Sequence, residues 1–201
     1  MPNWCSNVLY IDGPPDKVDA FVKAARGRGH AYKDYFSLRD GGEKWPVHDD
    51  IRLRAFFEEP IGSGAEELLC FHALHPVPES VLRLPYDSGQ AKELAKTLGL
   101  SDDTSGHTWE FDNWGTKWGA TEVHIDRTAK DSVRYNFDTA WGPALDLLKK
   151  VAGDWPELSF DLTYEEPGMA FGGGITYKDG CIVSAETYEM DHDDGDCDYD
   201  E

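Results

Sequence analysis

Residues 70–75, Cys-Phe-His-Ala-Leu-His, hold three side chains of the types that bind zinc. A structural zinc site takes four such ligands, usually as two spaced pairs. No matching second pair is present, and the chain's other cysteines are scattered without a C-x-x-C spacing. We therefore predict that Cys70, His72 and His75 bind no metal and that the cysteines are thiols.

A second group of metal-ligand types lies around a tryptophan-rich stretch: His107, Glu110, Asp112, His124 and Asp126. Alternation along a strand would put His124 and Asp126 on one face, and imidazole with carboxylate suits a divalent metal. With Lys117, this group supports an alternative function, a metal-dependent enzyme acting on nucleotides or nucleic acid. Because no nucleophile or defined cleft accompanies the group, we predict no catalytic residue, no cofactor and no metal.

Motifs that hold phosphates or activate a serine are missing. Residues 171–176, Phe-Gly-Gly-Gly-Ile-Thr, lack the lysine and the following helix of a P-loop, and glycines in a strand more often mark a bulge or a close approach. There is no G-x-S-x-G nucleophile elbow. The motifs therefore favour a protein that is not an enzyme.

Three of the seven tryptophans fall within residues 109–119, Trp-Glu-Phe-Asp-Asn-Trp-Gly-Thr-Lys-Trp-Gly. Large rings beside glycines indicate a rigid aromatic loop with Lys117 held between Trp114 and Trp118. Two interpretations stay open: a recognition loop whose Trp114, Lys117 and Trp118 contact a partner, or a structural corner joining two halves of the fold. Packing is the commoner role of such segments, so we predict that Trp114 and Trp118 are mostly buried.

The 201 residues include 39 acidic and 19 basic side chains, a formal net charge of −20. This charge opposes direct binding to nucleic acid and to anionic membranes. It favours a soluble protein, a protein that docks on a basic partner, or one that imitates nucleic acid. Residues 191–201 contain no Lys or Arg and are expected to form a disordered acidic tail. With no signal peptide and no apolar run of about 20 residues, the expected location is the cytoplasm.

Hydrophobic periodicity in the first half predicts a strand, a helix and an irregular region. Residues 3–11 are apolar on both faces, which indicates a central strand partly covered on both sides. The helix carries an apolar stripe over residues 18–25 and is closed by Gly27. Residues 28–106 are interpreted as an insertion, within which residues 90–98 form a helix capped by Ser88.

The second half is more regular. Alternation predicts a hairpin over residues 121–137, a helix over 144–151 that Gly153 ends, a strand over 158–164 and a last hairpin over 171–188. Strand–helix–strand–strand–helix–strand is the ferredoxin-like order. We predict one α+β ferredoxin-like domain over residues 1–190, with the insertion, the hairpin and the acidic tail added.

In this arrangement the helices cover one face of the sheet, and the opposite face carries mostly polar and charged side chains. Four of its carboxylates, Glu122, Asp126, Asp138 and Asp161, are hypothesised to contact a partner. Five carboxylates face one arginine, Arg134, on this surface, which argues against RNA binding there.

Several short motifs occur in a fixed order: residues 1–7 (Met-Pro-Asn-Trp-Cys-Ser-Asn), Phe71 with 76–79 (Pro-Val-Pro-Glu), 113–118 (Asn-Trp-Gly-Thr-Lys-Trp), 139–143 (Thr-Ala-Trp-Gly-Pro) and 160–166. Together they resemble the YubB-type family of phage and plasmid proteins, over nearly the whole chain except the tail. The resemblance implies a ferredoxin-like domain and an origin in a mobile element, and it supplies no catalytic residues.

The function predicted from these observations is a non-enzymatic accessory protein of a phage or other mobile element, acting in a bacterial host cytoplasm. Its negative surface would bind and inhibit a host protein that has a basic or nucleic-acid-binding surface, as an anti-defence mimic of nucleic acid, for example in anti-CRISPR or anti-restriction activity.

Overall fold

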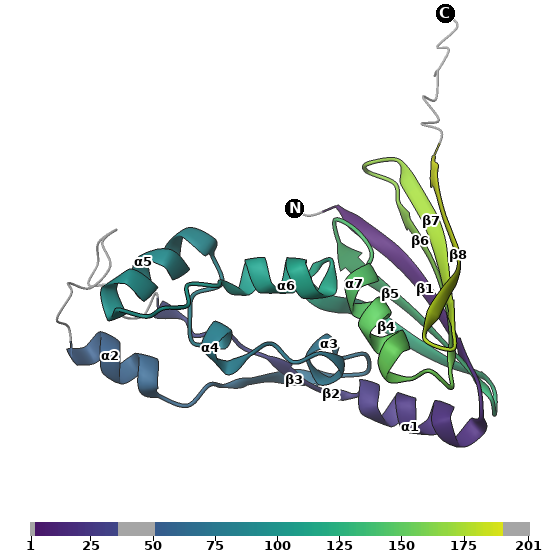
Figure 1. The fold of residues 1–201 in the computed structure, drawn as a ribbon, viewed down its shortest axis with the longest axis horizontal. Coiled ribbons are helices and arrows are strands. Elements are labelled where there is room, and N and C mark those ends of the chain that lie inside the picture. The colour runs from purple at the N-terminus through teal and green to yellow at the C-terminus, as the bar shows by residue number, and fades with distance from the viewer. Residues whose placement is uncertain (1–2, 36–50, 191–201) are drawn as a thin grey trace, which may run out of the picture.

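The strand β1 (Trp4–Asp12) lies in the interior of a six-stranded sheet, between β5 (Ser132–Ala140) and β6 (Ser159–Glu166), and pairs antiparallel with both. The structure is a computed structural model that describes residues 3–35 and 51–190 (Figure 1). The strand order is β4-β5-β1-β6-β7-β8, where the other members are β4 (Lys117–Ala129), β7 (Phe171–Lys178) and β8 (Cys181–Glu189). The prediction that the first strand is internal is confirmed.

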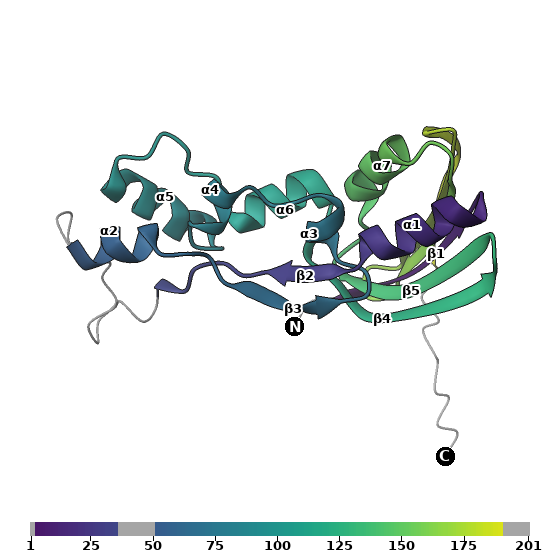
Figure 2. The same cartoon turned by 90° about the horizontal axis from the view of Figure 1, so that it is seen from below.

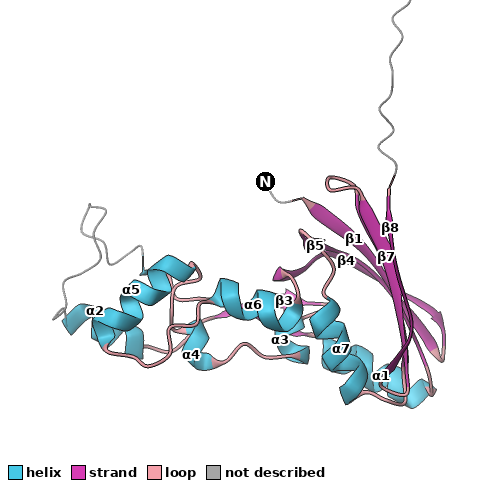
Figure 3. Ribbon diagram, turned by 45° about the horizontal axis from the view of Figure 1, so that its top comes forward, coloured by secondary structure: helices cyan, strands magenta, loops and turns pink. Residues whose placement is uncertain are grey.

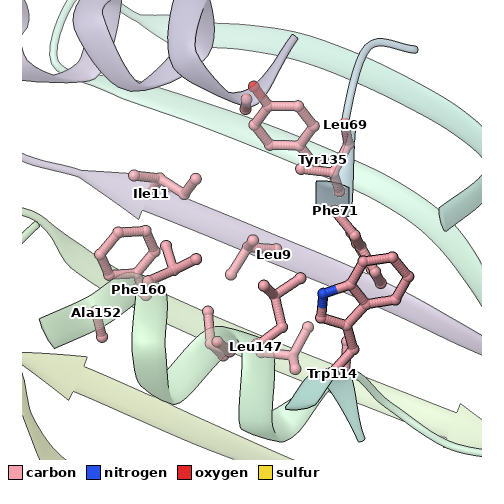
Figure 4. Packing of buried hydrophobic residues seen from close by; sticks show 14 of the residues in the cluster. Leu9, Ile11, Leu69, Phe71, Trp114, Tyr135, Leu147, Ala152 and Phe160 are labelled. Carbon is pink, nitrogen blue, oxygen red and sulfur yellow. The ribbon is translucent and has the colours of Figure 1, made fainter. Parts of the chain in front are cut away.

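Two helices, α1 (Pro15–Ala25) and α7 (Leu145–Asp154), lie on one face of this sheet (Figures 1 and 2). Their apolar stripes pack on the alternate side chains Leu9 and Ile11 of β1 in one hydrophobic core, which includes Phe21 of α1. Figure 4 shows Leu147 of α7 beside these β1 side chains. The opposite side chains of β1 are not covered to the same extent, since Trp4 is 42% exposed. The predicted partial cover of both faces is thus uneven, and the face away from the helices is the less covered one.

Between α1 and β4 the chain forms an extension beside the sheet, and Figure 3 shows that it is mainly helical. Its elements are a small hairpin of β2 (Gly27–His30) and β3 (Ser63–Glu67), and the helices α2 (Ile51–Glu58), α3 (Phe71–Leu74), α4 (Glu79–Leu82), α5 (Ser88–Leu98) and α6 (Gly106–Trp114). A second hydrophobic cluster, which includes Leu53 and Leu94, stabilises the outer part of this extension separately from the sheet's core.

The tryptophan-rich stretch is not the predicted loop. Its first half is the C-terminal part of α6, which Ser105 caps by accepting a hydrogen bond from the Thr108 amide. Gly115 ends the helix in the left-handed conformation (φ 78°), and β4 begins two residues later. The stretch is thus the corner between the extension and the sheet, because it contains the end of α6, the turn at Gly115 and the start of β4.

Trp114, the last residue of α6, is fully buried, as predicted. Its ring packs edge-on against Phe71, with ring centroids 5.6 Å apart, and its indole nitrogen donates to the His75 carbonyl oxygen at 3.1 Å (Figure 4). A buried indole needs such a partner for its N–H. Trp114 therefore connects α3 to the sheet's core.

Other local predictions have mixed outcomes. The two predicted hairpins, β4–β5 and β7–β8, are present, and Asp179 and Gly180 turn the second with positive φ at both residues, as a type I′ turn requires. Asp87 rather than Ser88 caps α5, because the Asp87 carboxylate accepts from the Gln90 amide. Gly153 lies inside α7 instead of ending it. The predicted tail, residues 191–201, lies outside the described residues.

Among the helices of the described residues, none has the length and apolar character needed to cross a lipid bilayer.

Candidate functional site

Glu110 on α6 is the centre of a buried polar network, and its side chain is completely removed from solvent. Its Oε1 accepts from the Tyr32 hydroxyl at 2.7 Å and lies 2.8 Å from His30 Nε2. Its Oε2 accepts from the Tyr86 hydroxyl and from the Trp118 amide, both at 2.9 Å. A buried carboxylate is stable only with partners of this kind, and these four partners connect three other segments of the chain to Glu110.

The two tyrosines of this network are held as hydrogen-bond donors. Burial, followed by the adjacent Glu110 carboxylate, raises the pKa of Tyr32 and of Tyr86 well above the ordinary value for tyrosine. Both hydroxyls therefore stay protonated over the physiological range. Glu110 is in consequence fully occupied as an acceptor and fixes the start of β4.

The Glu110 contact holds Trp118 in an unusual conformation. Trp118 has φ 70° and is 48% exposed, and Trp141, after β5, has φ 71° and is 43% exposed. A left-handed backbone costs a bulky residue on the order of 1–3 kcal/mol and persists only where surrounding contacts impose it. The prediction that Trp118 is mostly buried is wrong, because this backbone turns its ring outward at the end of the sheet.

Lys117 lies between the exposed rings of Trp118 and Trp141. The sequence had predicted that it lies between Trp114 and Trp118, so only one of the two predicted rings is correct. Its ammonium is 5.3 Å from the Trp118 ring centroid and 5.7 Å from that of Trp141, within the range of cation–π attraction. It also lies 3.4 Å from His107 Nε2. We call this group, with the surrounding cavity, the Lys117 pocket.

The Lys117 pocket is an open cavity of about 280 Å³ at the α6–β4 corner and the end of β5. Its walls combine aromatic, cationic and small residues: His107, Phe111, Gly115, Thr116, Lys117, Ala140, Trp141 and Gly142. Phe111 is 59% exposed, so its ring is available to a ligand. Few polar groups among apolar walls are typical of small-molecule sites.

A second candidate surface is the face of the sheet opposite α1 and α7, which we call the open face. Register aligns Asp138 with Ser6 and Glu165 across β5, β1 and β6. Asp138 accepts a hydrogen bond from the Ser6 hydroxyl at 3.0 Å. Because neighbouring strands are about 4.8 Å apart, Asp138 and Glu165 are separated by about 10 Å on a rigid support.

The remaining predicted carboxylates also lie at the surface. Asp161 is exposed and aligned with Tyr10 and Arg134. Asp126 forms an ion pair with Arg134 at 2.5 Å, which neutralises part of its charge. Glu122 is exposed on β4 where the register with β5 shifts. The structure thus brings Asp126, Asp138 and Asp161 to one face, whereas buried Trp114 is removed from any surface.

The two candidate metal groups are not assembled. Both carboxylate oxygens of Glu110 already accept hydrogen bonds, and His107 contacts Lys117. His124 lies on the edge strand β4, where it pairs with Asn136 of β5. In the earlier stretch His72 Nδ1 accepts from the Val77 amide, and burial raises the pKa of the Cys70 thiol to about 11. Within residues 3–35 and 51–190 no group of three or more His, Cys, Asp or Glu side chains is placed to hold a metal ion.

Sequence reasoning identified Lys117 and Trp118 but missed His30, Tyr32, Tyr86 and Trp141. Trp-Gly occurs at 114–115, 118–119 and 141–142, but only the last two tryptophans have a left-handed backbone, so this dipeptide alone did not identify Trp141. The sequence contains no signal for the two tyrosines, because Tyr32 and Tyr86 are far from Glu110 in the chain and contact it only in the folded protein.

Comparison with known proteins supports the fold. Residues 113–200 match a family model described as the ferredoxin-like domain in Api92-like protein. The chain is also similar to the crystal structure of a protein api92 from Yersinia pseudotuberculosis, with 14% identity and a TM-score of 0.63 over 96% of this chain and 100% of that one. Among curated proteins there is no significant match. The chain therefore has an α+β fold with a ferredoxin-like domain and an antiparallel sheet.

Proposed function

We propose that this protein is a non-enzymatic binding protein whose open face docks on a basic, nucleic-acid-binding surface of another protein. The observation that carries the proposal is the set of carboxylates on an uncovered, rigid sheet. Asp138 and Asp161 are free of ion pairs with the described residues, in a chain of net charge −20. Fixed negative charges complement a basic groove without paying the entropy that ordering a flexible acidic segment would cost.

The mode of action that we propose is imitation of nucleic acid. A groove that binds phosphates presents Lys and Arg side chains, and carboxylates held about 10 Å apart across the strands would neutralise them as phosphates do. Opposite charge also accelerates encounter, so association should be fast and should weaken as salt rises. Lys117 and Trp118, at the end of the same sheet, would lie at the rim of this interface.

The wider assignment is part of the same proposal. The order β1, α1, β4, β5, α7, β6 supports a ferredoxin-like domain interrupted by an insertion between α1 and β4. The short motifs shared with YubB-type proteins support an origin in a phage or plasmid. A partner in a bacterial host, such as a defence factor that holds nucleic acid, fits both the charge and that origin.

The test compares partner capture by the tagged protein and by a variant in which Glu122, Asp126, Asp138 and Asp161 are all changed to Lys. We expect the wild type to retain a basic protein at low salt, and to release it when salt or duplex DNA is added. The reversed variant should retain at least tenfold less, since each charge pair at an interface contributes on the order of 1 kcal/mol or more.

A matched control places the same four charge reversals on the extension, at Glu58, Glu66, Glu93 and Asp103, all of which are exposed. This variant changes the net charge equally but leaves the open face intact, so it should keep most of the binding. If both variants bind alike, or if DNA does not compete, the open face is not the interface and the mimicry proposal is wrong.

A further inference from the structure

The cation in the Lys117 pocket lacks an anionic partner among the described residues. Lys117 forms no ion pair there, although acidic residues outnumber basic ones by 39 to 19 in the chain. Its contacts are the two indole rings and His107 Nε2. A lysine held in place by two rings and without a carboxylate partner among the described residues presents its positive charge to an incoming anion.

The walls of the pocket favour a flat ring. Phe111 and Trp141 both line the cavity and both expose a large part of their rings, and such rings bind planar ligands by stacking. The strained backbone at Trp118 and Trp141 keeps the indoles beside Lys117, and strain of this kind is concentrated at functional sites. One pocket therefore offers a stacking surface and a positive charge side by side.

Size and charge limit what can enter. A cavity of about 280 Å³ lies just below the range of roughly 300–1,000 Å³ of sites for drug-sized molecules, so it fits one ring system with a short substituent. A nucleic-acid strand would bring many phosphates against a chain of net charge −20, whereas a small ligand brings one anionic group, which reaches Lys117 locally.

We propose that the Lys117 pocket binds a small ligand made of one flat aromatic ring system and one anionic group, either phosphate or carboxylate. The anion contacts the Lys117 ammonium, and the ring packs on Trp141 and Phe111. This site adjoins the open face at the end of the sheet, but its ligand is recognised without the partner proposed for that face.

The test is titration calorimetry with probes that separate ring from charge: adenosine 5′-monophosphate, benzoate, adenosine and inorganic phosphate. We expect at least one of the two ring-bearing anions to bind, with adenosine and phosphate at least tenfold weaker than that anion. The phosphate arm and the carboxylate arm decide which anion the pocket prefers. Quenching of tryptophan fluorescence should follow the same binding curve.

Three variants locate the ligand. Lys117→Met and Phe111→Ala should each weaken binding roughly tenfold, as loss of a charged contact or of a stacking ring commonly does. Trp141→Gly places glycine where φ is 71°, a conformation that glycine adopts readily, and should weaken binding without unfolding the chain. Trp4→Thr is the matched control, because Trp4 is similarly exposed but does not line the pocket.

The proposal is overturned if neither ring-bearing anion binds up to millimolar concentration, or if adenosine binds as tightly as its monophosphate and no carboxylate binds. It is also overturned if the Lys117→Met variant, shown by circular dichroism to be folded, binds as the wild type does. Reversal of Asp161 should leave ligand affinity within about twofold, because its register with Arg134 places it about 20 Å along the strands from Ala140, well beyond a Debye length of about 8 Å.

Discussion

At the scale of single residues, three neighbouring aromatic side chains have different roles although the same short stretch encodes them. Trp114 is fully buried in the core, Trp118 is half-exposed, and Phe111 is 59% exposed. What each ring meets decides this, since Trp114 packs on Phe71 in the core whereas Phe111 lines the open Lys117 pocket. Glu110, which precedes Phe111, accepts the hydrogen bond from the Trp118 amide.

Trp114→Ala should lower the free energy of unfolding by about 3–5 kcal/mol, the usual cost of deleting a large buried aromatic ring. The loss includes the contact with Phe71 and leaves the His75 carbonyl oxygen without its donor. Urea denaturation followed by circular dichroism measures it. Phe111→Ala is the control and should change stability by no more than about 0.5 kcal/mol. Equal effects of the two changes would contradict the placement of Trp114.

At the scale of elements, the position of the site depends on where α6 ends. Ser105 and Gly115 cap the helix, and the turn at Gly115 brings Lys117 to the end of β5, opposite Ala140. Without this stop the helix would carry Trp118 away from the sheet. The pocket is therefore a product of a helix terminus meeting a sheet edge, and not of either element alone.

Gly115→Ala should destabilise the fold more than Gly99→Ala does. Both glycines end a helix with φ near 70–78°, so each substitution pays about 1–2 kcal/mol for a left-handed alanine. A Cβ at Gly99 meets no atom within 4 Å, whereas one at Gly115 lies 3.2 Å from an Asp146 carboxylate oxygen and 3.3 Å from the Leu145 nitrogen. Thermal and urea unfolding of the two variants should rank them in this order; the reverse order would show that the α6–α7 approach is looser than described.

At the scale of the whole molecule, two hydrophobic clusters share one chain. The larger joins the sheet to α1, α3 and α7, and the smaller lies in the outer part of the extension. The Glu110 network connects β2 to β4. The Glu110 carboxylate contacts His30 of β2, 80 residues earlier, and accepts a hydrogen bond from the Trp118 amide of β4. Both candidate sites lie outside the cores, so the cores hold them in place without occupying them.

Stability should fall as pH rises from about 9. Burial, with the Glu166 carboxylate as the next cause, raises the pKa of Cys5 from 9.0 to about 12, and burial raises that of Cys70 from 9.0 to about 11. The unfolded chain releases these protons first, so above about pH 9 it binds fewer protons than the folded chain and becomes relatively more favourable. Below that pH both states hold the protons and the effect is absent.

Buried Tyr135, whose pKa burial raises to about 12, adds to the same trend from about pH 10. Urea midpoints measured at intervals from about pH 8 to 11 should therefore decrease steadily. In a Cys5→Ala variant the decrease should be shallower, even if its midpoint at pH 8 is lower. A midpoint that is constant over this range would contradict the burial of these groups.

The regular helices and strands could be predicted from local sequence patterns alone. Period-two alternation identified β4, β5 and β6, an i, i+3, i+4, i+7 stripe identified α1, and Asp179-Gly180 identified the last turn, because each pattern depends on neighbours a few residues apart. The burial of Trp114 was predicted correctly from its aromatic and glycine-rich surroundings, but the same reasoning failed for Trp118, which is 48% exposed. The acidic charge was likewise readable from composition alone.

Only the tertiary structure decided where the candidate sites lie. The exposure of Trp118 follows from a hydrogen bond to Glu110, and the partners of Lys117 include Trp141, 24 residues away. The tyrosines that complete the Glu110 network come from the extension, which has weak periodicity and was predicted only as an insertion. These contacts are set by how the elements pack against each other, and local pattern carries no information about packing between segments that are distant in the chain.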